Sequence, residues 1–424
     1  MPAEAAIETI TFGCRLNTLE SELMRRHAEA AGLRDTVIVH TCAVTAEAER
    51  QARQTIRRLR RERPAARILV TGCSAQLGAG GYAAMAEVDH VVGNAEKLRP
   101  ETWRTLAEGR ASRVEVGDIM REHTLAPHPV DGVEGRTRAF LQVQQGCDHR
   151  CTFCVIPFGR GPSRSLAPEA VLAQARTLLD AGYVELVVTG VDIASYGRDL
   201  PGRPGLGAML KELVATLPDL RRLRLSSLDP AAIDADLRDL IAEEPRLLPH
   251  LHLSAQAGDD LVLKRMRRRH VRADLVRTTH ELRRSRPDLV FGADLIAGFP
   301  TEDEAMFTRT LDLVEEAGLT FLHVFPYSAR PHTAAARMPQ LPVELRKERA
   351  ARLRAHGEAV LDTFLRRQLG QRRRALIERG RTGHTDQMAA VRPAAGAWWP
   401  PAGTVAEVVV TGVEGRTLTG RMVA

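Results

Sequence analysis

Short hydrophobic runs alternate with amphipathic stretches along residues 1–118. The short runs are typical of strands and lie at 7–12, 37–40, 67–70 and 90–92. The amphipathic stretches have helical periodicity and lie at 19–31 and 46–63, before Gly32 and Pro64. Strands that alternate with helices predict an α/β domain built on a parallel sheet.

A second series of alternating elements begins after residues 119–137, which contain Pro127 and Pro129 without periodicity and are expected to form a linker. Helices are expected at 168–181 and at 305–317, the latter after a capping box from Thr301 to Glu304. The strand candidates are 139–144, 184–189, 222–227, 250–254, 290–296 and 321–325. Six β/α units predict a partial (β/α)6 barrel over 138–365, with functional residues at the carboxyl ends of its strands.

The end of the chain has a different character. A charged helical stretch at 342–367 leads into residues with short hydrophobic runs and Gly-containing turns. The runs lie at 375–378, 388–391, 405–410 and 418–423. We expect residues 366–424 to form a small β-barrel.

Composition narrows the class of protein. Of the 424 residues, 44% are hydrophobic and 27% are charged, which excludes a disordered or low-complexity chain. The first residues carry no basic segment, and no hydrophobic run approaches the roughly 18 residues of a membrane span. We therefore expect a cytoplasmic protein with no membrane partner. A net charge of +7 favours a polyanionic partner, although a solvated Arg-rich surface is an equal alternative.

Three cysteines lie close together just after the first barrel strand. Cys147, Cys151 and Cys154 form a C-x3-C-x2-C run. Three thiolates at this spacing suit an iron–sulfur cluster, and a four-iron cluster held by three of them keeps one iron open. Zinc, with His149 as a fourth ligand, is the competing interpretation.

The other three cysteines occupy equivalent positions in the first domain. Cys14, Cys42 and Cys73 each follow a predicted strand, at separations of about one β/α unit. Because parallel strands end at one edge of a sheet, the three thiols are expected to converge there and hold a second cluster. Taken singly, each is more often a buried structural cysteine.

These segments resemble the radical S-adenosylmethionine methylthiotransferases over essentially the whole chain. The resemblance lies in residues 13–17, 41–45, 71–76 and 146–164, and the tail resembles a TRAM domain, a small RNA-binding β-barrel. Segments 189–197, 224–230, 252–270 and 292–302 are most similar to the MtaB type. That type converts N6-threonylcarbamoyladenosine beside the tRNA anticodon, at position 37, to its 2-methylthio derivative. Sister types act on isopentenyladenosine in tRNA or on a ribosomal protein.

The resemblance implies two [4Fe-4S] clusters and S-adenosylmethionine as cofactors. Cys147, Cys151 and Cys154 would hold the catalytic cluster, whose open iron binds S-adenosylmethionine, within a radical SAM core at 138–365. Cys14, Cys42 and Cys73 would hold the auxiliary cluster that carries the transferred sulfur. Cofactor contacts are expected from Phe153, Gly190, Asp192, Ser227, Gln256, Gly298 and Phe325. The alternative for Phe153 is a loop residue that packs into the barrel. For Gly190, Asp192, Ser227 and Gln256 it is an ordinary barrel-mouth or capping residue, and Gly298 and Phe325 are the weaker candidates.

The expected partners are a tRNA substrate, an electron donor protein and a sulfur source. Candidate RNA contacts are basic residues on the second helix, at 264–270 and at the entry to the tail. They include Arg53, Arg57, Arg58, Arg60, Arg61, Arg63, Arg366, Arg367 and residues 372–374. Trp398 and Trp399 could stack on bases or hold a loop in place. A zinc-stabilised RNA-binding protein without catalysis is the alternative from a different class.

Overall fold

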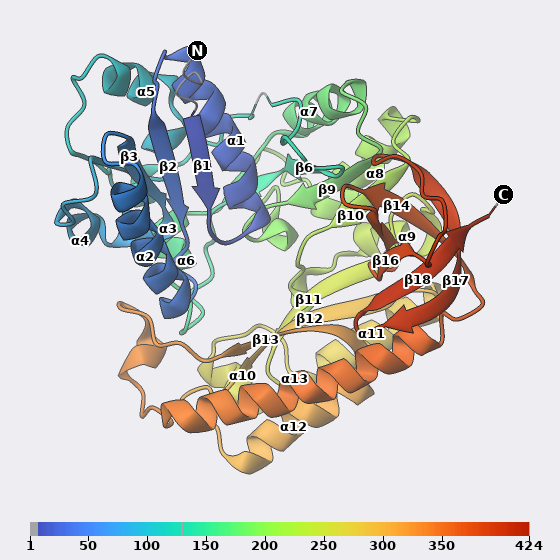
Figure 1. The fold of residues 1–424 in the computed structure, drawn as a ribbon. Coiled ribbons are helices and arrows are strands. Elements are labelled where there is room, and N and C mark those ends of the chain that lie inside the picture. The colour runs from blue at the N-terminus through green and yellow to red at the C-terminus, as the bar shows by residue number, and fades with distance from the viewer. Residues whose placement is uncertain (1–6, 129, 424) are drawn as a thin grey trace.

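Three parts of the chain are distinguished in the computed structural model, which describes residues 7–128 and 130–423. Figure 1 shows an N-terminal α/β domain in blue, a strand-and-helix barrel from green to orange, and a small barrel in red. The first six residues, which were expected to carry no basic segment, and Pro129 of the expected linker lie outside the described residues.

The N-terminal domain is built on a parallel five-stranded sheet in the order β1-β2-β3-β4-β5, as predicted. Its strands are β1 (Ile7–Thr11), β2 (Thr36–Thr41), β3 (Arg67–Gly72), β4 (His90–Val92) and β5 (Val114–Glu115). Sequence analysis missed β5, which is two residues long and includes an exposed valine. Its helices are α1 (Arg15–Ala30), α2 (Ala46–Glu62), α3 (Cys73–Leu77), α4 (Ala79–Ala83) and α5 (Pro100–Ala107).

Helices cover both faces of this sheet because successive strand residues point to opposite sides. Ile38 packs with Met24 of α1 and Trp103 of α5. Its neighbours Val37 and Val39 pack with α2 on the other face. Helix α1 begins at Arg15, four residues before the predicted start, with Cys14 as its N-cap.

The central part is a partial barrel of six parallel strands, as predicted. Two three-stranded sheets, β6-β9-β10 and β11-β12-β13, meet through a bridge between Leu228 and Leu253. The strands are β6 (Ala139–Gln142), β9 (Glu185–Thr189), β10 (Arg222–Leu225), β11 (His250–Gln256), β12 (Val290–Ala297) and β13 (Leu319–Pro326).

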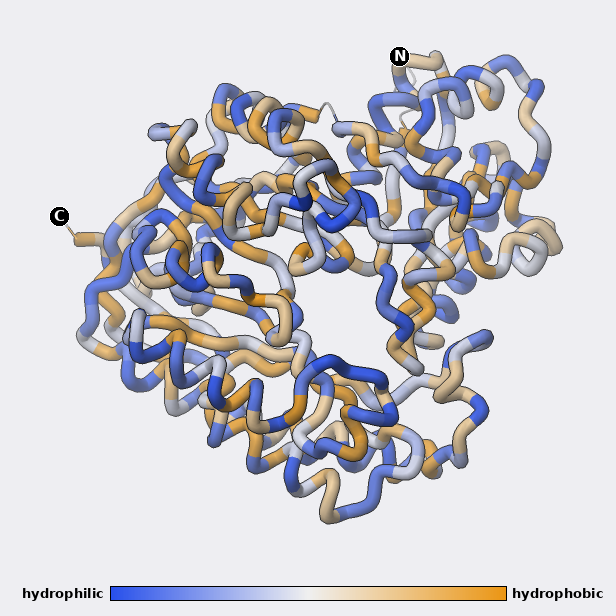
Figure 2. Tube along the Cα trace, turned by 180° about the vertical axis from the view of Figure 1, so that it is seen from behind, coloured by the Kyte–Doolittle hydropathy of each residue, from blue (hydrophilic) through white to orange (hydrophobic). Residues whose placement is uncertain are grey.

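Helices surround the outer face of the barrel and show alternating hydrophobic and hydrophilic positions in Figure 2. They are α7 (Pro168–Asp180), α8 (Leu206–Thr216), α9 (Ala235–Glu243), α10 (Asp260–Arg265), α11 (Arg272–Ser285), α12 (Glu304–Glu316) and α13 (Val343–Arg366). Helix α6 (Ile156–Arg160) lies instead against α3 of the N-terminal domain. Short 3-10 turns are η1 (Glu96–Leu98), η2 (Ile119–Arg121), η3 (Ile193–Ser195), η4 (Pro230–Ala232) and η5 (Ala334–Arg337).

The expected capping box before α12 is wrong. The side chain of Asp303 caps the helix by accepting a hydrogen bond from the Met306 amide at 2.7 Å. Thr301 has a positive φ of 67° and precedes the cap. The neighbouring Glu302 is buried and pairs with Arg349 of α13 at 3.0 Å.

The predicted first barrel strand also divides into two. After β6 the chain leaves the sheet, and β7 (Gln144–Gln145) pairs antiparallel with β8 (Arg164–Ser165). The reason is a close chain crossing, since a Cβ at Gly146 would lie 1.9 Å from the Pro162 carbonyl oxygen. This short ladder joins the two ends of the segment that carries Cys147, Cys151 and Cys154.

The C-terminal part is a closed five-stranded barrel in the order β14-β15-β16-β18-β17, which confirms the predicted small barrel. The strands are β14 (Arg372–Glu378), β15 (Thr382–Thr385), β16 (Ala390–Pro393), β17 (Val405–Glu414) and β18 (Thr417–Met422). Sequence analysis missed β15 because its residues, Thr-Gly-His-Thr, include no hydrophobic run.

Buried charges join this small barrel to the central one. Glu185 on β9 accepts hydrogen bonds from Arg222 at 2.7 Å and Arg224 at 2.8 Å, and Arg222 also pairs with Asp386 beyond β15. Burial alone would raise the pKa of Glu185, but the charges of Arg224 and Arg222 outweigh it and lower the pKa to about 2. Within residues 7–128 and 130–423, no helix is both long and apolar enough to span a membrane.

We expect Glu185→Gln to lower the free energy of unfolding at pH 7 by about 3 kcal/mol, because the neutral amide leaves the buried Arg224 without a counter-charge and Arg222 with Asp386 alone. The folded-state pKa of Glu185, about 2, lies below its ordinary value of 4.5. Its contribution is therefore present above pH 4.5 and disappears as the pH falls toward 2. Urea unfolding measured along this pH range checks the prediction.

The exposed Glu212→Gln on α8 is the matched control and should change stability by no more than about 0.5 kcal/mol. A difference between wild type and Glu185→Gln that stays constant from pH 7 to pH 2 would contradict the proposed role of this carboxylate.

Candidate active site

The first three cysteines meet at one edge of the N-terminal sheet. Cys14 follows β1, Cys42 follows β2, and Cys73 follows β3 as the first residue of α3. The strands are in register, so their carboxyl ends lie side by side. A Cβ at Gly13, the neighbour of Cys14, would lie 3.1 Å from the Cys42 sulfur. The structure therefore brings these three residues together.

Hydrogen-bond donors surround the sulfur atoms of this first triad. The Cys73 sulfur accepts from Arg160 Nε at 3.2 Å and from Asn94 Nδ2 at 3.8 Å, and the Cys42 sulfur accepts from the Val44 amide at 3.5 Å. Burial raises the pKa of the Cys42 thiol to about 11, while the Val44 amide acts in the opposite direction. N–H donors directed at sulfur are typical of thiolates that bind metal.

The second triad lies in the loop between β7 and α6. Thr152 ties this loop to the barrel, because its hydroxyl donates to the Arg265 carbonyl at 2.8 Å and its carbonyl accepts from the Ala335 amide at 2.9 Å. Arg268 donates to the Cys151 sulfur at 3.6 Å. Burial raises the pKa of Cys147 and of Cys154 to about 12, and Asp192 adds to the effect at Cys147.

The spacing of the second triad fits an iron–sulfur cluster better than zinc. Tetrahedral zinc, with Zn–S bonds of about 2.3 Å, would hold the three sulfur atoms about 3.8 Å apart. Among the described residues, two groups of possible metal ligands have all their ligand atoms within 4.8 Å of one another. They are Cys147 with His149 and Asp192, and His252 with Asp294 and His323, so the three sulfur atoms of the second triad are not such a group. His149 pairs with Asp192 at 2.9 Å. A cluster binds each thiolate to a different iron and accommodates the wider spacing.

A cavity of about 220 Å³ lies where the two domains meet. Its lining includes Val44 and Thr45, which follow Cys42, and Cys154 of the second triad. Three of the residues expected to contact a cofactor also line it, namely Phe153, Gln256 and Phe325. Gln256 has a positive φ of 71° at the end of β11, where the strand register shifts.

The other four expected cofactor residues are not among the described residues that line this cavity. Asp192 lies 3.9 Å from the Cys147 sulfur. A Cβ at Gly190 would lie 2.8 Å from the Gln144 carbonyl oxygen, so its lack of a side chain serves close packing. Gly298 similarly packs against Arg346 of α13, and Ser227 is half-buried after β10.

Sequence analysis missed a buried ionic network between the two triads. Glu20 of α1 pairs with Arg160 of α6 at 2.5 Å and with Lys97 at 2.8 Å. Lys97 also donates to His40 at 2.9 Å. All four side chains are almost completely buried. Because Arg160 follows the second triad in the chain and donates to Cys73 of the first, this network connects the two cysteine sites.

Electrostatics keep Glu20 ionised in this network. Burial would raise its pKa, but the charges of Arg160 and Lys97 hold the pKa well below its ordinary value. Burial, aided by the Lys97 charge, lowers the pKa of His40 well below its ordinary value. The network therefore contains one carboxylate and two cations around a neutral imidazole. Asn17, Asn94, Gln145 and Ser21 form further hydrogen bonds with these groups.

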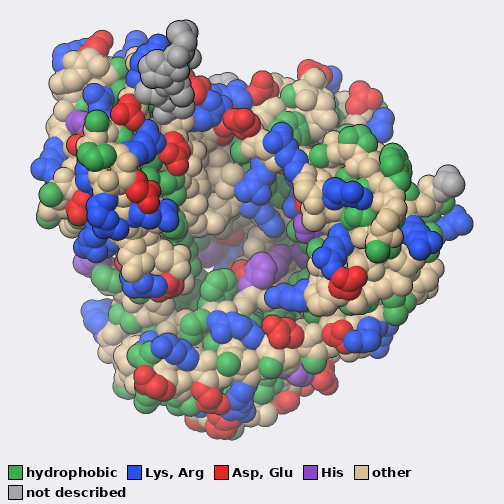
Figure 3. Space-filling model, in the orientation of Figure 1, with side chains coloured by type: hydrophobic (Ala, Val, Ile, Leu, Met, Phe, Trp, Pro, Cys, Tyr) green, Lys and Arg blue, Asp and Glu red, His purple; other side chains and the backbone are tan. Residues whose placement is uncertain are grey.

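The basic residues expected to contact RNA are partly engaged within the protein. Arg60 pairs with Asp89, and Arg374 pairs with Asp386. Trp399 is buried in the core of the small barrel, whereas the neighbouring Trp398 is 70% exposed. Figure 3 shows Lys and Arg side chains around the hollow between the N-terminal domain and the barrels, with histidine side chains inside it.

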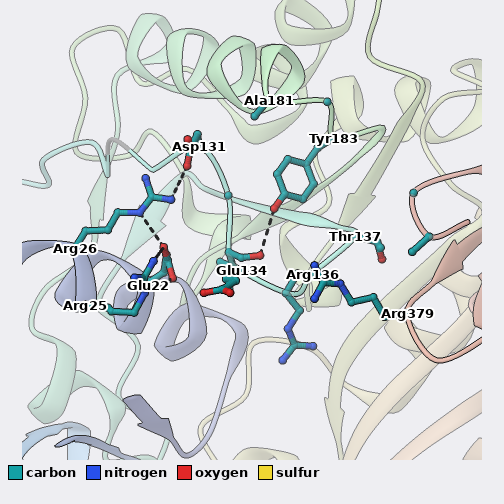
Figure 4. A pocket seen from close by; sticks show the side chains of 15 residues that line it. Glu22, Arg25, Arg26, Asp131, Glu134, Arg136, Thr137, Ala181, Tyr183 and Arg379 are labelled. Carbon is teal, nitrogen blue, oxygen red and sulfur yellow. Dashed lines mark hydrogen bonds and ion pairs between the residues drawn. The ribbon is translucent and has the colours of Figure 1, made fainter. Parts of the chain in front are cut away.

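A second pocket, of about 580 Å³, lies where α1, the linker and the small barrel meet. Figure 4 shows Arg26 held between Glu22 and Asp131. Arg136 and Arg379 also line the pocket, and neither forms an ion pair with another described residue. These two guanidinium groups are available to an anionic partner.

Comparisons with known proteins identify both domains. Residues 141–314 match the family model described as the Radical SAM superfamily, and residues 6–93 match the one described as Uncharacterized protein family UPF0004. The radical S-adenosylmethionine methyltransferase TsrM from Kitasatospora setae has a similar fold. Its TM-score is 0.56 at 15% identity, over 78% of this chain and 74% of that one.

Two kinds of curated relative match most of the chain. The threonylcarbamoyladenosine tRNA methylthiotransferase MtaB of Rickettsia prowazekii is 49% identical over 91% of this chain and 90% of its own length. The tRNA-2-methylthio-N(6)-dimethylallyladenosine synthase of Cereibacter sphaeroides is 36% identical over 81% of each chain. This chain therefore belongs to the radical S-adenosylmethionine methylthiotransferase family and is similar to its MtaB members.

Proposed function

We propose that this protein is a tRNA methylthiotransferase that converts N6-threonylcarbamoyladenosine, beside the anticodon at position 37, to its 2-methylthio derivative. The observation that carries this proposal is the meeting of two cysteine triads, from two domains, beside one cavity. The relatives named MtaB support the substrate. The reaction needs both triads near one substrate base, and the presence of Cys154 and of Val44, close to Cys42 in the chain, in the lining of one cavity supports this.

Cys147, Cys151 and Cys154 would hold a [4Fe-4S] cluster that, with S-adenosylmethionine, supplies radical chemistry when bound. The loop that carries them is tied down by Thr152 and by the β7–β8 ladder, which holds the thiols in place. Phe153, Gln256 and Phe325 line the adjoining cavity and would contact the cofactor. Gly190, Asp192, Ser227 and Gly298 would act at the barrel mouth, where Asp192 is next to Cys147.

Cys14, Cys42 and Cys73 would hold a second [4Fe-4S] cluster, which supplies the sulfur. The N–H donors from Arg160, Asn94 and Val44 support this assignment, since they would stabilise bound thiolates. Cys14 is exposed whereas Cys42 and Cys73 are buried, so the triad is open on one side.

The tRNA would approach along the basic rim of the hollow and contact the small C-terminal barrel. Exposed Trp398 and the unpaired Arg136 and Arg379 support this path. An electron donor protein and a sulfur source complete the expected partners. We place the reaction in the cytoplasm, where tRNA and reduced thiols are available.

Cys151→Ala should abolish reductive cleavage of S-adenosylmethionine, because it removes a ligand of the cluster that binds this cofactor. Cys42→Ala should leave cleavage intact and stop sulfur transfer, because it affects only the second triad. Anaerobic assays of deoxyadenosine and of methylthiolated RNA measure the two activities separately. Equal cleavage by both variants would contradict this division of roles.

A strain that lacks this protein should lose 2-methylthio-N6-threonylcarbamoyladenosine from its tRNA and accumulate the unmethylthiolated nucleoside. Mass spectrometry of tRNA nucleosides measures both species. The wild-type chain should restore the product, and the Cys151→Ala chain should not. Loss of the methylthio-dimethylallyl nucleoside instead would assign this protein to the other curated substrate.

Arg160→Met should lower the free energy of unfolding of the cluster-free protein by about 3–5 kcal/mol, because it removes one partner of a buried ion pair. Urea unfolding measures this loss. Arg50→Met, which breaks an exposed pair with Glu47, is the control and should cost at most about 1 kcal/mol. Adding Glu20→Gln to Arg160→Met should recover part of the loss, and strict additivity of the two substitutions would contradict the pairing.

A further inference from the structure

Three polar side chains from adjacent strands of the barrel form a cluster that the proposed chemistry does not use. His252 on β11 donates to Asp294 on β12 at 3.0 Å, and His323 on β13 donates to the same Asp294 oxygen at 3.3 Å. A Cβ at Gly292 would lie 2.6 Å from the His252 ring, so this glycine leaves room for the imidazole. Asp294 lines the cavity that also contains Cys154.

The cluster is accessible from the hollow between the domains. The His323 side chain is 62% exposed and Asp294 is 25% exposed, whereas His252 is nearly buried. Figure 3 shows histidine side chains within this hollow. A ligand that reaches Asp294 from the cavity could also contact the exposed His323, while the hydrogen bond from His252 holds Asp294 in place.

Arg15 lies at the start of α1 in the N-terminal domain, where the charge of Asp294 reaches it across the domain boundary. It follows Cys14 at the start of α1, and among the described residues it forms no ion pair or hydrogen bond. Burial and the charges of Arg138 and Arg224 lower its pKa, whereas the negative charge of Asp294 acts in the opposite direction. Arg138 and Arg224 already pair with Glu378 and Glu185. Arg15 is thus a half-buried guanidinium without a bound carboxylate.

The two substrates named by the curated relatives differ in the group on N6 of adenosine. A dimethylallyl group is a hydrocarbon and needs an apolar surface, whereas a threonylcarbamoyl group carries a carboxylate, a hydroxyl and a urea. Burying a carboxylate requires a cation or several N–H donors. Burying Arg15, Asp294 and His323 against a hydrocarbon would remove their hydrogen bonds to water and supply no new ones.

We propose that Arg15, Asp294 and His323 form the subsite that recognises the threonylcarbamoyl group, with Arg15 bound to its carboxylate and the Asp294–His323 pair bound to its hydroxyl. This assignment rests on the proposed function and extends it to substrate selection. His252 is a positioning residue, because it orients Asp294. A metal ion at His252, Asp294 and His323 fits less well, since the carboxylate oxygen already accepts from both imidazoles and a cation is close by.

Binding of three anticodon stem-loop RNAs to the reconstituted protein tests the assignment. The RNAs carry threonylcarbamoyladenosine, dimethylallyladenosine or unmodified adenosine at the same position. The wild-type protein should bind the threonylcarbamoyl RNA most tightly. Arg15→Met should weaken this binding by about tenfold or more and leave the other two RNAs within about twofold. Arg15→Lys, which keeps the charge, should lose less, and His323→Leu should reduce the same preference.

Arg277→Met and His280→Gln, exposed on α11 away from the cavity, are matched controls and should bind all three RNAs as the wild type does. If the wild-type protein does not prefer the threonylcarbamoyl RNA, the proposed function itself is wrong. If it does and the Arg15 and His323 variants keep the preference, only this subsite is wrong. A further metal ion per chain that disappears in His323→Leu would likewise overturn the assignment.

Discussion

The arrangement of the two cysteine sites depends on one buried guanidinium. Arg160 is the last residue of α6 in the radical SAM domain, yet it donates to Cys73 and pairs with Glu20 in the N-terminal domain. A buried cation must be compensated, so Glu20 stays ionised, and Lys97 and the amides around it complete the set. These ion pairs and hydrogen bonds cross the domain boundary, so they fix the two domains in one relative orientation. The cavity between the domains depends on that orientation.

The positions of the six cysteines could be predicted from sequence because they depend on local periodicity. Parallel β/α units place residues after each strand at a common edge, and Cys14, Cys42 and Cys73 follow this rule. Glu20 and Lys97 could not be recognised, because a charged residue in an amphipathic pattern indicates a solvated position, and only the tertiary contact with Arg160 shows otherwise. Strand β15 was missed for a related reason, since its residues are polar and small.

Two sets of polar side chains lie at different strands of the same barrel. Residues beside Cys147, among them Gln144 and Asp192, come from the first half, next to β6 and β9. His252, Asp294 and His323 come from β11, β12 and β13 in the second half. Asp294 lines the same cavity as Gln256 and Phe325. The side chains that we propose to select the substrate and those that we expect to contact the cofactor thus share one cavity.

The shared contact of Arg222 with Glu185 and Asp386 has a mechanical consequence. The Arg222 side chain is almost completely buried and pairs with a carboxylate in each barrel. The C-terminal barrel is therefore fixed to the central barrel and does not move as an independent domain on a flexible linker. The C-terminal barrel thus keeps a constant distance from the cavity between the other two domains. A long ligand that contacts both the small barrel and the cavity would therefore be selected by its length as well as by its chemistry.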